Sequence, residues 1–162
     1  MKIEVIPGVL TAQEVDLLLE QVNPKATAEP MKYFDGLERN YGIKKVQCLD
    51  NEIVQQLITR QQLNAESATI LYYPRGSRNE THSDNSVVNA DGTVERVRDW
   101  TSTAVVFLNK NYIGGELVYP NQGAMFAPTV GTMVVASANH EYLHFVKPVV
   151  QGERFTLVLR IL

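Results

Sequence analysis

The 162-residue sequence predicts a mainly β fold, a sandwich or jelly roll, braced by N-terminal α-helices. After residue 66, short runs rich in β-branched and aromatic residues alternate with clusters of Gly, Pro, Asn and Asp, and no helical pattern intervenes. Before that point, two stretches repeat their apolar residues at helical spacing. The length suits one domain, 1–162, in which 1–66 supplies a strand and supporting helices and 67–162 forms the jelly-roll core.

The N-terminal part carries clear helix signals. Thr11 and Glu14 have the spacing of a capping box, and Asn23-Pro24 predicts the end of the helix that they begin. A second helix is predicted from Asp50. Both apolar stripes indicate surfaces that face a core and have no chemistry of their own.

Strands and turns are predicted along the rest of the chain. The strands are expected at residues 1–6, 68–73, 94–98, 101–108, 116–119, 132–136, 142–146 and 155–162. The turns are expected at residues 74–76, 89–92, 114–115, 128–131 and 151–152.

Composition excludes several classes of protein. A net charge of −3 and a pI near 5.6 argue against general binding to nucleic acid or to an anionic membrane. No apolar run approaches the ~20 residues of a spanning helix, and the first residues lack the apolar core of a signal peptide. Cys48 is the only cysteine, which excludes an internal disulfide and favours a reducing, cytoplasmic location.

Three histidines and one nearby aspartate are candidate metal ligands. His82 and Asp84 are two residues apart, so in an extended segment both side chains point to the same side. A third ligand on a later strand, His140 or His144, would complete two imidazoles and one carboxylate. Non-haem Fe(II) oxygenases use that set, and zinc sites that activate water also use three protein ligands.

Arg154 follows His144 by ten residues, beyond a turn at Gln151-Gly152. A hairpin is therefore predicted to bring their two strands side by side. A guanidinium near the metal would bind a carboxylate through two parallel hydrogen bonds. The alternative is a surface arginine on a terminal strand.

Four segments together resemble the catalytic domain of prolyl 4-hydroxylases and related 2-oxoglutarate-dependent dioxygenases. In order, they are Tyr73-Pro74-Arg75-Gly76 with His82-Ser83-Asp84, then Phe107-Leu108-Asn109, then residues 114–120 (Gly-Gly-Glu-Leu-Val-Tyr-Pro), and finally residues 144–149 (His-Phe-Val-Lys-Pro-Val) with Gly152-Glu153-Arg154. The resemblance covers residues 67–160 and implies a double-stranded β-helix, the jelly roll of that family.

The resemblance also implies cofactors and their ligands. The cofactors would be Fe(II), 2-oxoglutarate and O2, with ascorbate as an optional reductant. His82, Asp84 and His144 would bind the iron, because only His144, and not His140, has the following residues in family register. Arg154 would pair with the distal carboxylate of 2-oxoglutarate.

Two further residues correspond to the family's cosubstrate pocket. The resemblance implies that Tyr73 hydrogen-bonds or flanks 2-oxoglutarate and that Leu117 contacts its carbon chain. Both are equally well explained as core residues. Gly114 and Gly115 indicate a tight turn whose backbone approaches a neighbour closely.

The implied reaction is hydroxylation of a substrate C–H bond with formation of succinate and CO2. Peptidyl proline is one candidate substrate, within a wider class of peptides, proteins and small molecules. Prolyl hydroxylases contact their peptide through an arginine at a position where this chain has Trp100, with Arg98 two residues earlier. The segment Ser86 to Arg98 predicts a hairpin that would close over a substrate as a mobile lid.

Two alternatives remain at this stage. The first is a nucleobase-demethylating dioxygenase, because Arg154 and Arg160 have the spacing of the arginine pair in that family. The residues between them lack its Asn and Thr pattern, and the net charge argues against gripping DNA. The second is a non-catalytic jelly-roll module with a structural or zinc-filled metal site.

Overall fold

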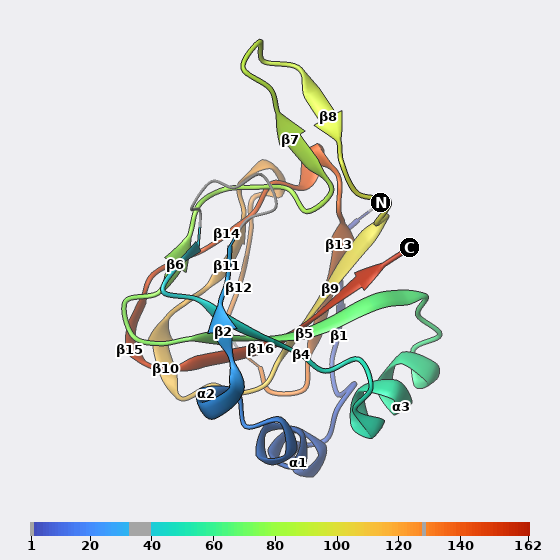
Figure 1. The fold of residues 1–162 in the computed structure, drawn as a ribbon, viewed down its shortest axis with the longest axis vertical. Coiled ribbons are helices and arrows are strands. Elements are labelled where there is room, and N and C mark those ends of the chain that lie inside the picture. Colours follow the sequence, from blue (N-terminus) through green and yellow to red (C-terminus); the bar gives the residue numbers. More distant parts are fainter. Residues whose placement is uncertain (1, 33–39, 128) are drawn as a thin grey trace.

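A seven-stranded antiparallel sheet is the largest element of the computed structural model, which describes residues 2–32, 40–127 and 129–162 (Figure 1). Its strand order is β1-β13-β9-β16-β5-β4-β2. The strands are β1 (Glu4–Ile6), β2 (Glu29–Pro30), β4 (Lys44–Gln47), β5 (Ala65–Tyr73), β9 (Ser102–Phe107), β13 (Met133–Ser137) and β16 (Arg154–Ile161). Met1 of the predicted first strand and Pro128 of a predicted turn lie outside the described residues.

Shorter strands form four small sheets, with the orders β12-β11-β14, β10-β15, β3-β6 and β7-β8. These strands are β3 (Asn40–Tyr41), β6 (Arg78–Asn79), β7 (Ser86–Val88), β8 (Val94–Arg96), β10 (Tyr112–Gly114), β11 (Leu117–Tyr119), β12 (Ala124–Phe126), β14 (Phe145–Val146) and β15 (Val149–Gly152). The helices are α1 (Ala12–Val22), α2 (Pro24–Thr27) and α3 (Glu52–Arg60), with 3-10 helices η1 (Pro120–Gln122) and η2 (His140–Tyr142).

Side chains alternate between two buried clusters along the central strands. On β9, Ala104 and Val106 belong to an outer cluster, whereas Val105 and Phe107 belong to an inner cluster. The outer cluster also contains side chains of α1 and α3, and the inner cluster contains side chains of β11 and β14. The large sheet is therefore buried on both faces, and the inner cluster lies between two sheets. This mainly β arrangement is consistent with the predicted jelly roll.

The predicted helix starts agree with the structure. The amide of Glu14 donates to Oγ1 of Thr11 over 3.1 Å, and the amide of Thr11 donates to Oε1 of Glu14 over 3.0 Å, which confirms the capping box. Helix α1 ends at Asn23, which adopts a left-handed conformation, and Pro24 begins α2. The cap of α3 is Asn51, one residue after the predicted start.

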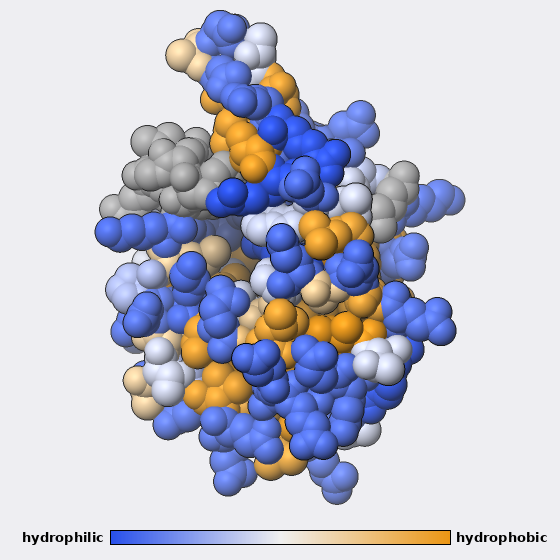
Figure 2. Space-filling view, turned by 45° about the vertical axis from the view of Figure 1, so that its right-hand side comes forward, coloured by the Kyte–Doolittle hydropathy of each residue, from blue (hydrophilic) through white to orange (hydrophobic). Residues whose placement is uncertain are grey.

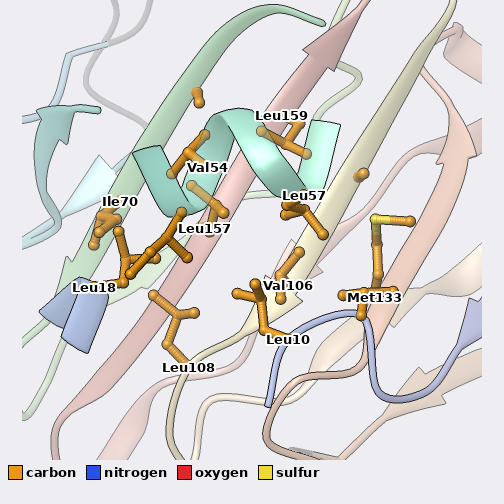
Figure 3. Packing of buried hydrophobic residues seen from close by; sticks show 14 of the residues in the cluster. Leu10, Leu18, Val54, Leu57, Ile70, Val106, Leu108, Met133, Leu157 and Leu159 are labelled. Carbon is orange, nitrogen blue, oxygen red and sulfur yellow. The ribbon is translucent and has the colours of Figure 1, made fainter. Parts of the chain in front are cut away.

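Leu57 of α3 is 0% exposed and lies in the outer cluster, among side chains of β9 and β16 (Figure 3). We expect Leu57→Ala to lower the free energy of unfolding by about 2–5 kcal/mol, because it leaves a cavity in a packed cluster. The matched control is Leu17→Ala in α1, where the side chain is 45% exposed and the loss should be about 0.5 kcal/mol or less. Urea unfolding followed by circular dichroism measures both, and equal losses would contradict the packing of α3.

Some predicted elements differ from the observed ones. The predicted strand 142–146 is wrong in its first part, because Tyr142 ends the 3-10 helix η2 and only Phe145–Val146 pairs with β11. The predicted strand 94–98 stops at Arg96. The polar strand β4 and the short strands β10, β12 and β15 lack a clear alternating pattern and were not predicted.

The predicted hairpin around residues 89–92 is confirmed, since β7 pairs with β8 and the amide of Asn89 donates to the carbonyl of Thr93. The hairpin projects from the body of the molecule (Figures 1 and 2). Its Val88 and Val94 side chains are exposed. Cys48 is a free thiol buried in the outer cluster, where burial raises its pKa to about 12.

In the part of the chain that the structure describes, no helix has the length and apolar character needed to cross a membrane.

Candidate metal centre and cosubstrate pocket

Two backbone hydrogen bonds hold His82 opposite His144. The amide of His82 donates to the carbonyl of His144 over 3.0 Å, and the amide of His144 donates to the carbonyl of His82 over 2.9 Å. This reciprocal pair is an isolated antiparallel bridge between segments far apart in the sequence. The bridge places the two imidazole rings with their centroids 4.4 Å apart.

Asp84 lies beside both rings. Its Oδ1 is 3.7 Å from Nε2 of His82, and its Oδ2 is 3.5 Å from Nε2 of His144. The three candidate ligand atoms all lie within 4.8 Å of one another, and the three side chains are largely buried. The structure therefore brings together the two imidazoles and the carboxylate that the sequence singled out. His140 is not in this group and lies in η2.

The imidazole rings are oriented for metal binding. Nδ1 of His82 lies 2.7 Å from the carbonyl oxygen of Glu80, and Nδ1 of His144 lies 3.0 Å from that of Tyr142. Because a carbonyl only accepts, Nδ1 carries a proton in each ring, which leaves Nε2, on the side of Asp84, as the nitrogen that can bind a metal. Burial, together with the neighbouring His144, lowers the pKa of His82 to about 3, so this ring is neutral at pH 7, as a metal ligand must be.

Arg160 is a partner of Asp84 that the sequence did not indicate. Its Nη1 lies 3.3 Å from Oδ2 of Asp84 and donates to Oγ1 of Thr103 over 3.2 Å. Burial alone would raise the pKa of Asp84, but neighbouring positive charge, above all the Arg160 guanidinium, holds this pKa below its ordinary value. Asp84 is therefore a carboxylate at neutral pH. The sequence offered one hint of this role, the six-residue spacing of Arg154 and Arg160, which puts both side chains on the same face of a strand.

Arg154 is 1% exposed, and its Cζ lies 4.4 Å from the centre of the Tyr73 ring. Among the described residues, its Nε and Nη1 have no hydrogen-bond partner. A buried guanidinium with unsatisfied nitrogens is costly, so these two nitrogens are well suited to bind an anion. The hydroxyl of Thr156, two residues along the same face of β16, is also buried without a described partner.

The predicted side-by-side placement of the His144 and Arg154 strands is wrong. The segment that carries His144 continues into β14, which pairs with β11, whereas Arg154 begins β16, which pairs with β5 and β9. The two side chains line one cavity from different sheets, together with Tyr73, Leu117 and Asp84. The predicted turn at residues 151–152 is also wrong, because Gln151 and Gly152 belong to β15, which pairs with β10, and no hairpin joins β15 to β16.

Gly115 lies against this cavity, as the sequence predicted for a close backbone approach. It has a φ of +67°, and a Cβ at this position would lie 3.0 Å from Cδ of Arg154 and 3.1 Å from Cε2 of Tyr112. Glycine thus leaves room for the arginine side chain.

Arg98 and Trp100 lie outside any strand, although residue 98 was included in the predicted strand 94–98. They nevertheless lie near each other, with Cζ of Arg98 5.7 Å from the centre of the Trp100 ring. Both line a groove of about 490 Å³ that also reaches His82, Asp84 and Arg160. The candidate metal centre therefore opens into a space large enough for a substrate.

Asn85 is a buried structural residue that the sequence did not indicate. Its carbonyl accepts from the amides of Val97 and Arg98, and its Nδ2 donates to the carbonyl of Trp100 over 2.9 Å. Its amide donates to the carbonyl of Ala138. Asn85 therefore ties both ends of the β7–β8 hairpin to the sheet immediately beside Asp84.

The donor atoms and the buried guanidinium fit a known family. The family model of the 2OG-Fe(II) oxygenase superfamily matches residues 68–160. This range contains the three candidate metal ligands and Arg154. No curated protein sequence matches the chain.

Solved structures with the same fold include several prolyl hydroxylases. The viral collagen prolyl hydroxylase of Paramecium bursaria Chlorella virus-1, in complex with 2OG, is 19% identical; the match covers 99% of this chain and 96% of that one, with a TM-score of 0.77. A Pseudomonas putida prolyl-4-hydroxylase is 21% identical over 99% and 92%, with a TM-score of 0.68. A Trichoplax adhaerens prolyl hydroxylase, in complex with a hypoxia inducible factor peptide fragment, is 18% identical over 98% and 82%, with a TM-score of 0.72.

Proposed function

The chain belongs to the 2OG-Fe(II) oxygenase superfamily, and on that premise we propose that it hydroxylates a C–H bond of a peptide or small-molecule substrate. The family and the His-Asp-His group together support Fe(II), 2-oxoglutarate and O2 as its cofactors. The observation that carries the proposal is the buried guanidinium of Arg154, two nitrogens of which lack a partner among the described residues, in the cavity that also contains the candidate metal ligands.

His82, Asp84 and His144 would hold the iron through two neutral imidazoles and one carboxylate. When bound, Fe(II) with 2-oxoglutarate and O2 supplies the oxidising power that converts C–H to C–OH, and succinate and CO2 are the other products. Arg160 would keep the carboxylate of Asp84 in place through its contact with Oδ2. Burial of the three ligands would keep bulk water away from the reacting atoms.

Arg154 would bind the distal carboxylate of 2-oxoglutarate through Nε and Nη1, which lack a partner among the described residues. Tyr73 would flank the cosubstrate, because its ring already lies against the guanidinium. Leu117 would contact the carbon chain from the opposite sheet, since it is buried and lines the same cavity.

Peptidyl proline is the substrate that we propose to test first. The Trichoplax prolyl hydroxylase of the same fold holds a peptide, and Arg98 and Trp100 lie in the groove beside the metal ligands. The β7–β8 hairpin above this groove would act as the lid. We also propose that 1–162 is one catalytic domain, in which α1 and α3 brace the sheet of the core.

The test is turnover of the cosubstrate with two different metals. Protein loaded with Fe(II) is expected to convert 2-oxoglutarate to succinate slowly without substrate, whereas Zn(II)-loaded protein is expected to form none, because zinc has no redox chemistry. Succinate is measured by NMR. If the iron-loaded protein forms no succinate, the remaining interpretation is a non-catalytic metal-binding module.

A second measurement identifies the substrate class. A proline-containing peptide library is incubated with the Fe(II)-loaded protein, and mass spectrometry searches for products about 16 Da heavier. Single-stranded DNA is added in a parallel reaction, and a dependence of succinate formation on DNA alone would exclude the peptide substrate.

Gly115→Ala is expected to raise the apparent KM for 2-oxoglutarate about 3- to 10-fold, because the new Cβ displaces the Arg154 side chain. The matched control is Gly123→Ala, whose φ of +61° imposes similar backbone strain but whose Cβ would meet nothing within 4 Å. Both variants should lose about 1–2 kcal/mol of stability. Succinate formation at varied 2-oxoglutarate measures the difference, and an equal KM in both variants would count against the role of Gly115.

A further inference from the structure

The side chain of Asn109 is bonded to the main chain on both sides of Arg154. Its Nδ2 donates to the carbonyl of Glu153 over 2.7 Å, and its Oδ1 accepts from the amide of Phe155 over 2.9 Å. Because a carbonyl only accepts and a main-chain amide only donates, these two bonds also fix the orientation of the Asn109 amide group. One side chain therefore spans Arg154 and holds the residue before it and the residue after it.

Asn109 takes over where the pairing between β9 and β16 ends. β9 ends at Phe107, and the amide of Leu108 donates to the carbonyl of Phe155 over 3.0 Å. Arg154 is the first residue of β16 and lies beyond the end of this ladder. The Asn109 side chain supplies the main-chain contacts that a longer β9 would otherwise make.

On its other side, the same part of β16 pairs with β5. Arg154 pairs with Tyr73, and Phe155 pairs with Tyr72. The rings of Tyr72 and Phe155 stack with their centroids 5.0 Å apart, and the hydroxyl of Tyr72 donates to Oε1 of Glu153 over 3.1 Å. The start of β16 is therefore held between β5 and Asn109.

The guanidinium of Arg154 depends on this main-chain support. Among the described residues, its Nε and Nη1 have no hydrogen-bond partner that would hold them in place. Its Cζ lies 4.4 Å from the centre of the Tyr73 ring and 5.6 Å from that of Phe107. Ring faces attract a cation without fixing the direction of its N–H groups. The position of the main chain thus decides where these nitrogens lie.

We propose that Asn109 is a positioning residue for the cosubstrate, which places Arg154 so that Nε and Nη1 meet the distal carboxylate of 2-oxoglutarate. The inference rests on the proposed function, because Arg154 is the residue assigned there to that carboxylate. Two parallel hydrogen bonds to a carboxylate require both nitrogens in register with its oxygens. Loss of the Asn109 bonds therefore weakens binding of a 2-oxo acid that has a distal carboxylate and spares one that has none.

The test compares two 2-oxo acids and needs no turnover. 2-Oxoglutarate has the distal carboxylate, and 2-oxobutyrate has the same 2-oxo acid end without it. Titrations of the Zn(II)-loaded protein, followed by NMR, measure both dissociation constants. We expect Asn109→Ala to weaken binding of 2-oxoglutarate about 3- to 10-fold and to leave binding of 2-oxobutyrate unchanged. An unchanged ratio of the two constants in a folded Asn109→Ala protein would overturn the proposal.

Two controls separate this role from a general loss of stability. Asn51 also accepts from two main-chain amides, at the start of α3, so Asn51→Ala should lower the melting temperature by about 2–4 °C, as Asn109→Ala should. Asn111→Ala removes the remaining contact of Nδ2 of Asn109, which is 2.8 Å long. Both controls should keep the ratio of the two dissociation constants. Loss of this ratio in Asn51→Ala would make destabilisation the cause and would overturn the proposal.

A second variant decides the outcome if Asn109→Ala fails to fold. Asn109→Asp keeps an oxygen that accepts from Phe155 but loses the donor to Glu153, and it should also weaken binding of 2-oxoglutarate alone. If neither variant folds, the Phe155 amide signal of the parent protein is followed by NMR. It should move with 2-oxoglutarate and not with 2-oxobutyrate, and an equal response to both acids would overturn the proposal.

The parent protein distinguishes this inference from the proposed function. Equal binding of both acids by the parent would refute the role of Arg154 and the inference with it. Tighter binding of 2-oxoglutarate by the parent, retained in a folded Asn109→Ala protein, would refute the role of Asn109 alone.

Discussion

Replacing Asp84 with alanine is expected to reduce conversion of 2-oxoglutarate to below about 1% of the parent rate. Asp84 supplies the carboxylate of the three-residue group, and both of its oxygens lie within 3.7 Å of an imidazole nitrogen. Residues that only support a metal ligand already cost 10- to 100-fold when they are replaced, so loss of a ligand should cost more. Fe(II) binding under anaerobic conditions, followed by calorimetry, should weaken in parallel.

The controls separate metal binding from folding. Asp16→Ala removes an exposed carboxylate from helix α1 and should leave both measurements unchanged. Because Asp84→Ala also removes the partner of Arg160, it should destabilise the protein, and circular dichroism must show that the variant is folded at the assay temperature. A folded Asp84→Ala variant with normal turnover would refute the ligand assignment.

Replacing Arg154 with glutamine is expected to raise the apparent KM for 2-oxoglutarate about 10- to 100-fold. The magnitude corresponds to hydrogen bonds to a charged group, which contribute about 1.5–3 kcal/mol. Metal binding should not change, because Arg154 is not one of the candidate ligands. The parent protein should also gain thermal stability when 2-oxoglutarate and Zn(II) are added, and the variant should lose most of that gain.

The unliganded Arg154→Gln protein provides a second, opposite expectation. Because Nε and Nη1 of Arg154 are buried without described partners, removal of the charge should leave the stability of the cofactor-free protein unchanged or higher. Lys147→Gln, which removes an exposed charge near the same part of the chain, is the matched control. An unchanged KM in Arg154→Gln would show that another residue binds the distal carboxylate of 2-oxoglutarate, and Arg160 would be the next candidate.

Local signals in the sequence predicted local structure well. The capping box at Thr11 and Glu14 and the turn around residues 89–92 depend on neighbours in the chain, and both are present. His82 and Asp84 are also close in sequence, so their common facing follows from a short extended segment. The family resemblance then selected His144 over His140, which spacing alone left open.

Pairing between distant segments was not predictable in the same way. The ten-residue spacing of His144 and Arg154 predicted a hairpin, but β15 pairs with β10, and the two residues approach the cavity from different sheets. The contact of Arg160 with Asp84 depends on how far β16 extends beside β9. Such a contact depends on how the strands pair in the folded protein. A single sequence shows only how residues alternate along each strand.

The roles of Asn85 and the His82–His144 bridge have a consequence for variation of the protein. The bridge fixes the separation of two candidate ligands, His82 and His144, through main-chain hydrogen bonds. Asn85 holds both ends of the β7–β8 hairpin in place just after Asp84, the third candidate ligand. The length and sequence of the turn of this hairpin, residues 89–93, can therefore change while the geometry of the three candidate ligands stays the same. We expect changes in this turn to leave Fe(II) binding unchanged from that of the parent protein.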